Sequence, residues 1–149
     1  LMAYAPRFRR ITSFRTDKII SAKINEVSEQ FDEMQKVFEG IRPHIWGVST
    51  TSWSGERMGH VDFTVRYGED EQYIPRRLER EKQCGMVEHL DSNTCRFTAD
   101  VFDTSELIPW IRTFICRITE IHFSDQALEE QFKNDIKAMY ELYGIGGET

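Results

Sequence analysis

The beginning of the chain alternates apolar and polar positions in three short stretches, residues 1–5, 9–14 and 19–25. Alternation with a period of two is typical of half-buried strands, so the pattern predicts three short strands. Pro6 and Arg7 supply the first turn. Asp17 and Lys18 interrupt the next pair, as a tight turn or as one helical turn. Three strands bury only one face, so we expect them to pair with further strands or with another chain.

A helix and an irregular segment follow this strand region. Ser28 fits the N-terminal cap of a helix, apolar residues follow at helical spacing, and Gly40 ends the segment. Residues 41–56 are rich in Gly, Ser and Thr, which indicates a linker or an irregular loop. For Trp46 and Trp53, which lie in this loop, we favour packing against a surface over contact with a ligand.

The pattern from residue 57 onward predicts four strands, at residues 60–67, 86–90, 94–102 and 116–123. A charged helix over 69–83 has Pro75 in its first turn, where proline is tolerated. Asp103 and Glu106 resemble a capping box that begins a second helix, and Ser124 is expected to cap a last helix. The order β-α-β-β-α-β predicts a ferredoxin-like domain, with both crossover helices on one face of a four-stranded antiparallel sheet.

The composition is that of a protein able to form a core. The chain has 149 residues, of which 40% are hydrophobic and 30% charged, enough for one domain or for a small domain plus a fragment. No apolar run reaches the roughly 18–20 residues of a membrane span. The opening stretch places its charges after its apolar residues, which is the wrong order for a signal peptide. We therefore expect a cytoplasmic location and, because the first residue is Leu1, a fragment of a longer protein.

The candidate metal and redox residues form no motif. The three cysteines, Cys84, Cys95 and Cys116, include no C-x-x-C pair, so we expect small core residues in a reducing compartment. The four histidines lie far apart in the sequence without ligand spacing. The chain also lacks the G-x-S-x-G, P-loop and H-E-x-x-H motifs. We predict a binding module without a cofactor or metal, and not an enzyme.

Charge is divided unevenly along the chain. Residues 1–23 contain six cationic residues and only Asp17 as an acid, a balance of +5 in a protein whose net charge is -6. Such asymmetry favours a local anionic partner over a general affinity for nucleic acid. The alternative is a solvated strand face whose cations balance acidic residues elsewhere.

Three stretches of the chain resemble a known family. Phe14-Arg15-Thr16-Asp17-Lys18-Ile19 resembles the F-R-x-D-R-I motif at the end of the WYL domain, with Lys18 in place of the usual arginine. "DTSELIPWIRTF" and "RITEIHFSDQALEEQF", followed by a closing helix with aromatic residues, are similar to the C-terminal extension of many WYL domains. In the family the helix that contains Trp110 usually ends in a glycine and leads to a strand ending near a proline, and this chain lacks both.

The resemblance covers nearly the whole chain and implies a domain organisation of the α+β class. Residues 1–27 would be the end strands of a small Sm/SH3-like β-barrel, truncated at its start. Residues 28–56 would be a helix and linker, 57–145 a ferredoxin-like C-terminal extension with an extra C-terminal helix, and 146–149 a tail.

The resemblance also implies a function in bacterial transcription regulation. The chain would be the effector-sensing and oligomerising region of a WYL-type regulator, a homodimer that acts on promoter DNA through a helix-turn-helix domain absent from this chain. The effector would be an anionic, nucleotide-like molecule or single-stranded nucleic acid, which guanidinium groups bind through paired planar hydrogen bonds. The first candidate set for such binding is Arg7, Arg9, Arg10, Arg15 and Lys18.

Two details refine these candidates. An ion pair with Asp17 would fix the direction of Arg15, and Arg10 would share a strand face with Thr12 if it opposes Ile11. The second candidate set is Arg76, Arg77 and Arg80, which helical spacing brings to one face. Salt bridges to Glu79 and neighbouring acids are the alternative role of this second set.

Two other functions remain open. One is a protein-interaction module that dimerises through its sheet without a ligand. The other is a nucleic-acid-binding accessory of an RNA-guided defence system, where WYL proteins also occur. Binding of nucleic acid should weaken steeply with salt, whereas apolar dimerisation should not.

Overall fold

The computed structural model describes residues 1–24, 26, 30–51 and 58–144 of the 149-residue chain, and its fold is mixed α+β. The strands are β1 Met2–Ala5, β2 Arg10–Ser13, β3 Gly59–Arg66, β4 Met86–His89, β5 Thr94–Val101 and β6 Ile118–Phe123. The α-helices are α1 Phe31–Ile41, α2 Tyr73–Glu81, α3 Ile108–Ile111 and α4 Gln126–Leu142. None of the helices in the described part of the chain combines the length and the apolar character that a membrane span needs.

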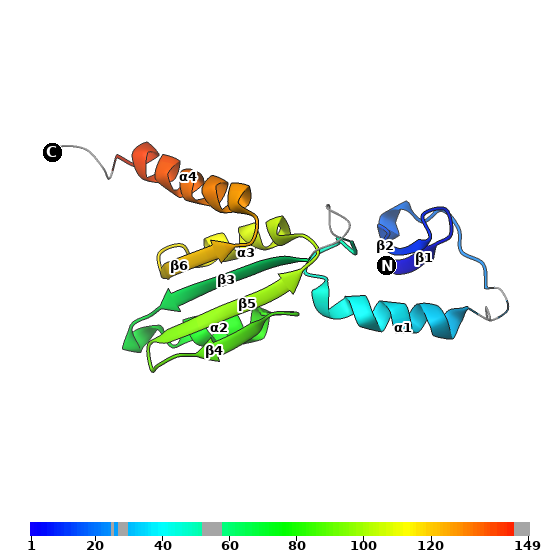
Figure 1. The fold of residues 1–149 in the computed structure, drawn as a ribbon, viewed down its shortest axis with the longest axis horizontal. Helices are drawn as coiled ribbons and strands as arrows, with labels where there is room; N and C mark the ends of the chain where they lie inside the picture. Colours follow the sequence, from blue (N-terminus) through cyan, green and yellow to red (C-terminus); the bar gives the residue numbers. More distant parts are fainter. Residues whose placement is uncertain (25, 27–29, 52–57, 145–149) are drawn as a thin grey trace.

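The strands form two antiparallel sheets. β1 and β2 make a hairpin, and the other four strands follow the order β4-β5-β3-β6. Figure 1 places the hairpin and α1 beside one end of the larger sheet, while α4 extends away from β6. The described residues therefore comprise a small N-terminal unit and a larger unit built on four strands.

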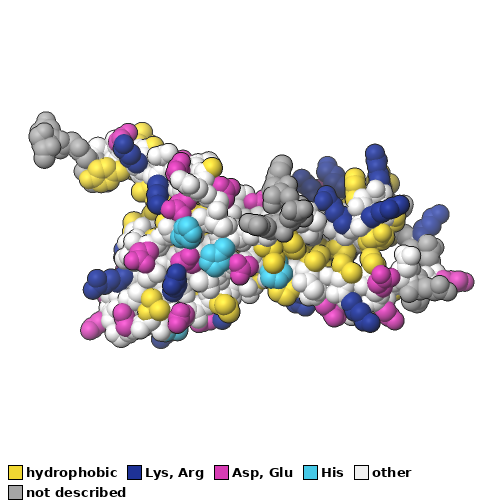
Figure 2. Space-filling view, in the orientation of Figure 1, with side chains coloured by type: hydrophobic (Ala, Val, Ile, Leu, Met, Phe, Trp, Pro, Cys, Tyr) yellow, Lys and Arg dark blue, Asp and Glu magenta, His cyan; other side chains and the backbone are white. Residues whose placement is uncertain are grey.

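The central strand β3 separates a covered face of the larger sheet from an open one. Val61, Phe63 and Val65 are fully buried on one side, whereas His60 and Asp62 point to the other. The apolar residues of α2 and α3 belong to the same core cluster as the buried side chains of β3. Both crossover helices therefore cover one face, and Figure 2 shows histidine, acidic and basic side chains on the other.

Aromatic rings fill the core beneath the sheet. The Phe97 ring lies 5.2 Å from that of Phe63 and 4.9 Å from that of Trp110, measured between centroids. Trp46 packs against Trp110 at 4.9 Å and is 8% exposed. The prediction that Trp46 packs against a surface is therefore confirmed, while Trp53 lies outside the described residues.

The third predicted strand is wrong. Residues 19–24, all of which the structure describes, form no strand, and residue 25 lies outside the described part. The side chains of Ile20 and Ile24 are fully exposed, so among the described residues the alternating pattern has no partner strand or core to pack against. The predicted break before this stretch is confirmed as one 3-10 turn, Thr16–Lys18. The expected cap Ser28 lies outside the described residues, and α1 begins at Phe31.

The helices of the larger unit differ from the prediction in two places. One helix is predicted after Asp103, but the segment consists of two 3-10 turns, Thr104–Leu107 and Arg112–Phe114, joined by the short α3. A continuous helix from Thr104 is interrupted because Pro109 has no backbone N–H to donate. α4 is capped by Asp125, whose carboxylate accepts hydrogen bonds from two backbone N–H groups, and not by Ser124. The expected place of Pro75, in the first turn of α2, is confirmed.

One carboxylate attaches α4 to the sheet. Glu129 accepts hydrogen bonds from the backbone N–H of Phe123 at 3.0 Å and from His122 Nδ1 at 2.8 Å, and it pairs with Lys133. The pKa of Glu129 is lowered from 4.5 to about 2, mainly by the hydrogen bond from Lys133 and next by the hydrogen bond from the Phe123 N–H. The ionised carboxylate therefore stabilises the packing of α4 on β6.

We expect Phe97→Ala to lower the free energy of unfolding by about 3–5 kcal/mol, because Phe97 is fully buried among the rings of Trp46, Phe63 and Trp110. Phe8→Ala is the matched control, since Phe8 is 58% exposed, and it should change that free energy by less than about 0.5 kcal/mol. Urea denaturation followed by circular dichroism measures both. Equal losses in the two variants would contradict the assignment of the core.

Glu129→Gln should lower the free energy of unfolding by about 1–2 kcal/mol at pH 7. The folded-state pKa is depressed, so this contribution is present above the ordinary value of 4.5 and is lost as pH falls toward about 2. The difference between parent and variant should therefore shrink between pH 5 and pH 3 in denaturant titrations. Glu130→Gln, one residue along the same helix, is the control. A difference that does not change with pH would contradict the role assigned to the ionised carboxylate.

Candidate functional site

The N-terminal hairpin presents a cluster of cations to solvent. Arg7, Arg9 and Arg10 lie in the β1–β2 connection and at the start of β2, and Arg15 and Lys18 lie at the following 3-10 turn. All five are exposed. Figure 2 shows dark-blue side chains gathered over this part of the molecule. The structure therefore brings the first candidate set together on one small unit, which we call the basic hairpin (residues 1–18).

An exposed aromatic ring lies between the arginines of the basic hairpin. The guanidinium carbons of Arg7 and Arg10 lie 5.8 Å and 5.9 Å from the centroid of the Phe8 ring. A ring flanked by cations can stack on a nucleobase while the cations contact phosphates. Phe8 is not among the site residues predicted from the sequence, although an aromatic residue between two arginines in a predicted turn is a usable signal.

Arg9 has an uncommon backbone conformation in the same turn. Its φ is +50°, in the left-handed region that favours glycine. Backbone hydrogen bonds from Phe8 N–H to Ala5 O (3.0 Å) and from Arg9 N–H to Pro6 O (3.2 Å) close the turn. The turn therefore projects three successive side chains, at positions 7–9, into solvent.

The two sequence predictions about Arg15 and Arg10 are confirmed. Arg15 donates two hydrogen bonds to Asp17, from Nε at 3.0 Å and from Nη2 at 2.7 Å. This pairing lowers the pKa of Asp17 and raises that of Arg15. Because the pair is exposed, it orients the guanidinium more than it stabilises the fold. The β1–β2 register places Arg10 and Thr12 on the face opposite to Ile11, and Arg10 Nη1 donates to Thr51 Oγ1 at 3.0 Å.

The second candidate set lies on α2, apart from the basic hairpin. Arg77 donates to Glu81 Oε2 and to Thr113 Oγ1, both at 2.9 Å, and its guanidinium lies 4.7 Å from the centre of the Phe114 ring. Arg80 pairs with Glu81 at 2.9 Å. Salt bridges, the alternative role of this set, are therefore found for both arginines, and the shared acid is Glu81.

Arg76 differs from its two neighbours on α2. It is exposed and lies with Arg80 and His89 at a shallow pocket, where Glu79 is paired with Lys82 at 2.7 Å. The structure therefore leaves Arg76 and Arg80 accessible to an anion, whereas Arg77 is part of the packing beneath the sheet.

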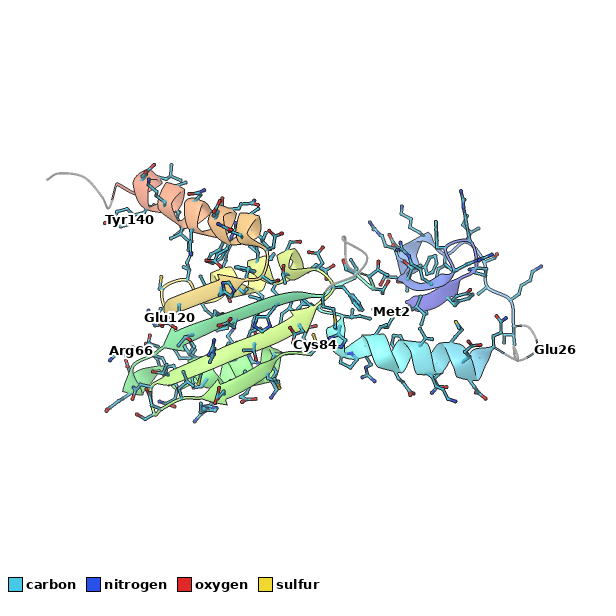
Figure 3. The ribbon with its side chains drawn as sticks, in the orientation of Figure 1. Met2, Glu26, Arg66, Cys84, Glu120 and Tyr140 are labelled. Carbon is cyan, nitrogen blue, oxygen red and sulfur yellow. The ribbon has the colours of Figure 1, made fainter. Side chains whose placement is uncertain are left out.

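Two grooves lie outside the basic hairpin. A polar groove of about 1230 Å³ is lined by Arg66, Arg96, Arg117 and Glu120, among others, but Arg96 is paired with Asp62 at 2.7 Å and Arg117 with Glu71. Figure 3 shows Arg66 and Glu120 on the four-stranded unit, with Arg66 at the end far from Met2. An apolar groove of about 470 Å³ lies between the hairpin and α1, and its lining includes Met2, Tyr4, Ile11, Met34 and Phe38.

The cysteines lie outside the basic hairpin. Cys95 is fully buried, with Tyr67 Oη at 3.3 Å and His89 Nδ1 at 3.2 Å, and burial raises the pKa of its thiol. Cys84 is partly buried, and burial raises its pKa as well. Cys116 is exposed, so the expectation that all three are core residues is wrong for it. Within the described residues, no three His, Cys, Asp or Glu side chains are grouped to hold a metal ion.

No family model, curated protein or solved structure matches this chain. The residues of the basic hairpin and their surroundings are therefore the basis for assigning a function.

Arg77→Ala should lower the free energy of unfolding by about 1–2 kcal/mol, because the side chain packs on Phe114 and is bonded to Glu81 and Thr113. Arg76→Ala on the same helix is the control and should change it by less than about 0.5 kcal/mol. Thermal and urea denaturation distinguish the two variants. If both substitutions lower the free energy of unfolding equally, Arg77 has no packing role and is again a candidate ligand contact.

Proposed function

We propose that this chain is the effector-sensing and oligomerising region of a bacterial WYL-type transcriptional regulator. It binds an anionic, nucleotide-like or single-stranded nucleic-acid ligand through the basic hairpin and acts without catalysis. The observation that supports this most directly is the exposed cluster of Arg7, Arg9, Arg10, Arg15 and Lys18 around the Phe8 ring. Asp17 is the one acid among residues 1–23, so the local field favours an anion.

The architecture supports the proposed domain organisation. The order β4-β5-β3-β6, with antiparallel neighbours and α2 and α3 on one face, is the order expected for a ferredoxin-like βαββαβ unit. We assign residues 57–145 to such a unit. We also assign the hairpin of β1 and β2 to the end of a small Sm/SH3-like barrel.

The chemistry of the hairpin suits a phosphate-containing ligand. Guanidinium groups donate paired hydrogen bonds to phosphate oxygens, and the exposed ring of Phe8 offers a stacking surface for a base. Arg15 is already oriented by its two bonds to Asp17. In the proposed regulator, ligand binding changes the placement of a DNA-binding domain outside this chain, in a cytoplasmic homodimer that acts on promoter DNA.

A second candidate function is a dimerisation module without a ligand. The apolar groove between the hairpin and α1 favours it, because its lining is largely hydrophobic. Several large apolar side chains outside the groove are also exposed in the N-terminal unit, namely Phe14, Ile19, Ile20, Ile24 and Val37. Apolar association of this kind should be insensitive to salt, which separates it from binding through the basic hairpin.

We expect the triple substitution Arg9→Gln, Arg10→Gln and Arg15→Gln to abolish binding of a short single-stranded oligonucleotide. Any binding that remains at low salt should have a smaller slope of log affinity against log salt, by about 0.7 for each lost phosphate contact and therefore by about 2 for the three. Fluorescence anisotropy at several salt concentrations measures both quantities, with thermal melting as the control for folding.

Arg76→Gln with Arg80→Gln is the matched control, because these exposed arginines lie on α2. The control should retain the affinity of the parent. If the triple variant binds as tightly as the parent, the basic hairpin is only a solvated face and the dimerisation module becomes the preferred function. Loss of binding in the control alone would move the site to α2.

A further inference from the structure

Residues Trp46–Thr51 connect the two units of the molecule, and we call them the coupling loop. At its start the loop is joined to the larger sheet. The His44 carbonyl accepts a hydrogen bond from the Phe102 N–H at 3.1 Å, and Trp46 packs against Phe97 and Trp110. At its end the loop is bonded to the basic hairpin. It therefore lies between the proposed ligand site and the four-stranded unit.

The carboxylate of Glu106 holds the middle of the coupling loop. Oε2 accepts a hydrogen bond from the Gly47 N–H at 2.9 Å. Oε1 accepts three, from Val48 N–H at 3.0 Å, from Ser49 N–H at 3.1 Å and from Ser49 Oγ at 3.0 Å. Three successive N–H groups directed at one anion form a strong local binding concavity. The loop position therefore depends on one side chain from the Thr104–Leu107 turn.

Gly47 is required for this close approach. A Cβ atom at position 47 would lie 2.7 Å from Glu106 Oε2, inside the distance that side chains tolerate. Any larger residue would push the loop and the carboxylate apart. The sequence predicts a capping-box role for Glu106, but in the structure its side chain bonds the loop, and the Asp103 side chain caps the turn.

Three hydrogen bonds attach the other end of the coupling loop to the basic hairpin. Thr50 Oγ1 donates to the Ile11 carbonyl at 2.7 Å in a buried position, and Ser13 Oγ donates to the Val48 carbonyl at 3.0 Å. The third is the bond from Arg10 Nη1 to Thr51 Oγ1. One of the proposed ligand contacts is thus already bonded to the loop.

We propose that the coupling loop links occupancy of the basic hairpin to the placement of that hairpin on the four-stranded unit, with Glu106 as the positioning residue. The proposal rests on the proposed function. A phosphate oxygen accepts a stronger, charge-assisted hydrogen bond than the Thr51 hydroxyl, so a bound anion draws Arg10 away from Thr51. One attachment of the hairpin is lost, while Glu106 keeps the loop on the sheet.

The hairpin is sensitive to this change because it has little stability of its own. An isolated two-stranded hairpin is marginally stable in water, so its order depends on its attachments to the loop and to α1. By linkage, a ligand that favours the detached hairpin binds more tightly when the loop is already loosened. Glu106 thereby opposes ligand binding from outside the ligand site.

Hydrogen exchange of the ligand-free protein tests the first half of the proposal. Glu106→Gln and Gly47→Ala should each speed exchange in residues 1–14 by about five- to tenfold, while β3 and β5 stay protected. Glu88→Gln is the matched control, because Glu88 is exposed on β4. Unchanged exchange in residues 1–14 in both test variants would overturn the role of Glu106. Glu106→Gln and Gly47→Ala weaken the same contact between the loop and the carboxylate in different ways, so the test stays decisive if one variant fails to fold.

Adding the single-stranded oligonucleotide tests the second half. In the parent, binding should speed exchange in residues 1–14, while the N–H groups of residues 47–49 stay protected because they remain bonded to Glu106. In Glu106→Gln, whose hairpin is already loosened, the ligand-induced change in residues 1–14 should be smaller and the affinity several-fold higher. An equal response of residues 1–14 in both proteins, or weaker binding by the variant, would overturn the coupling. If the parent binds no oligonucleotide, both the proposed function and the proposed response to ligand are wrong. Hydrogen exchange of the ligand-free protein still decides whether Glu106 positions the hairpin.

Discussion

The larger unit depends on the fact that only one face of its four-stranded sheet is covered. The two-residue period of β3 directs Val61, Phe63 and Val65 into a core shared by α2, α3 and Trp46. The same period directs the polar residues of β3 to the open side, where Asp62 pairs with Arg96 and His60 lies 2.8 Å from Asp100. An aromatic-filled layer results, against which the coupling loop is held by Trp46 and Glu106, and α4 by Phe132 and Glu129.

These two carboxylates illustrate how the fold uses acidic residues. Glu106 accepts hydrogen bonds from backbone N–H groups of the coupling loop, and Glu129 accepts one from the backbone N–H of Phe123 at the end of β6. Arg77 and Arg80 of α2 and Arg96 of β5 are likewise paired with acids. In the basic hairpin, by contrast, Asp17 is the one acid, and it is bonded to Arg15. Positive charge is therefore balanced where the chain packs and left in excess where it meets solvent.

Much of the larger unit follows from local pattern, because each strand and helix there has its own periodicity and its own turn or cap. Pro75 and the alternation of residues 60–67 are examples. The third N-terminal strand failed for the opposite reason: alternation indicates a strand only if a partner exists, and Ile20 and Ile24 have none among the described residues. The role of Glu106 could not be read locally, since it depends on loop 47–49, which lies 57 or more residues away in the chain. Phe8 did have a local signal, its place between Arg7 and Arg9, but its position beside Arg10 depends on the fold of the hairpin turn.

The left-handed backbone of Arg9 has a consequence for how this surface can change. Non-glycine residues in that region cost on the order of 1 kcal/mol relative to glycine, so a glycine at position 9 would relax the turn. The same substitution would remove a cation from the centre of the basic hairpin. Local stability and surface charge are thus opposed at a single position, and selection of variants for thermal stability alone would be expected to erode the charge of this turn first.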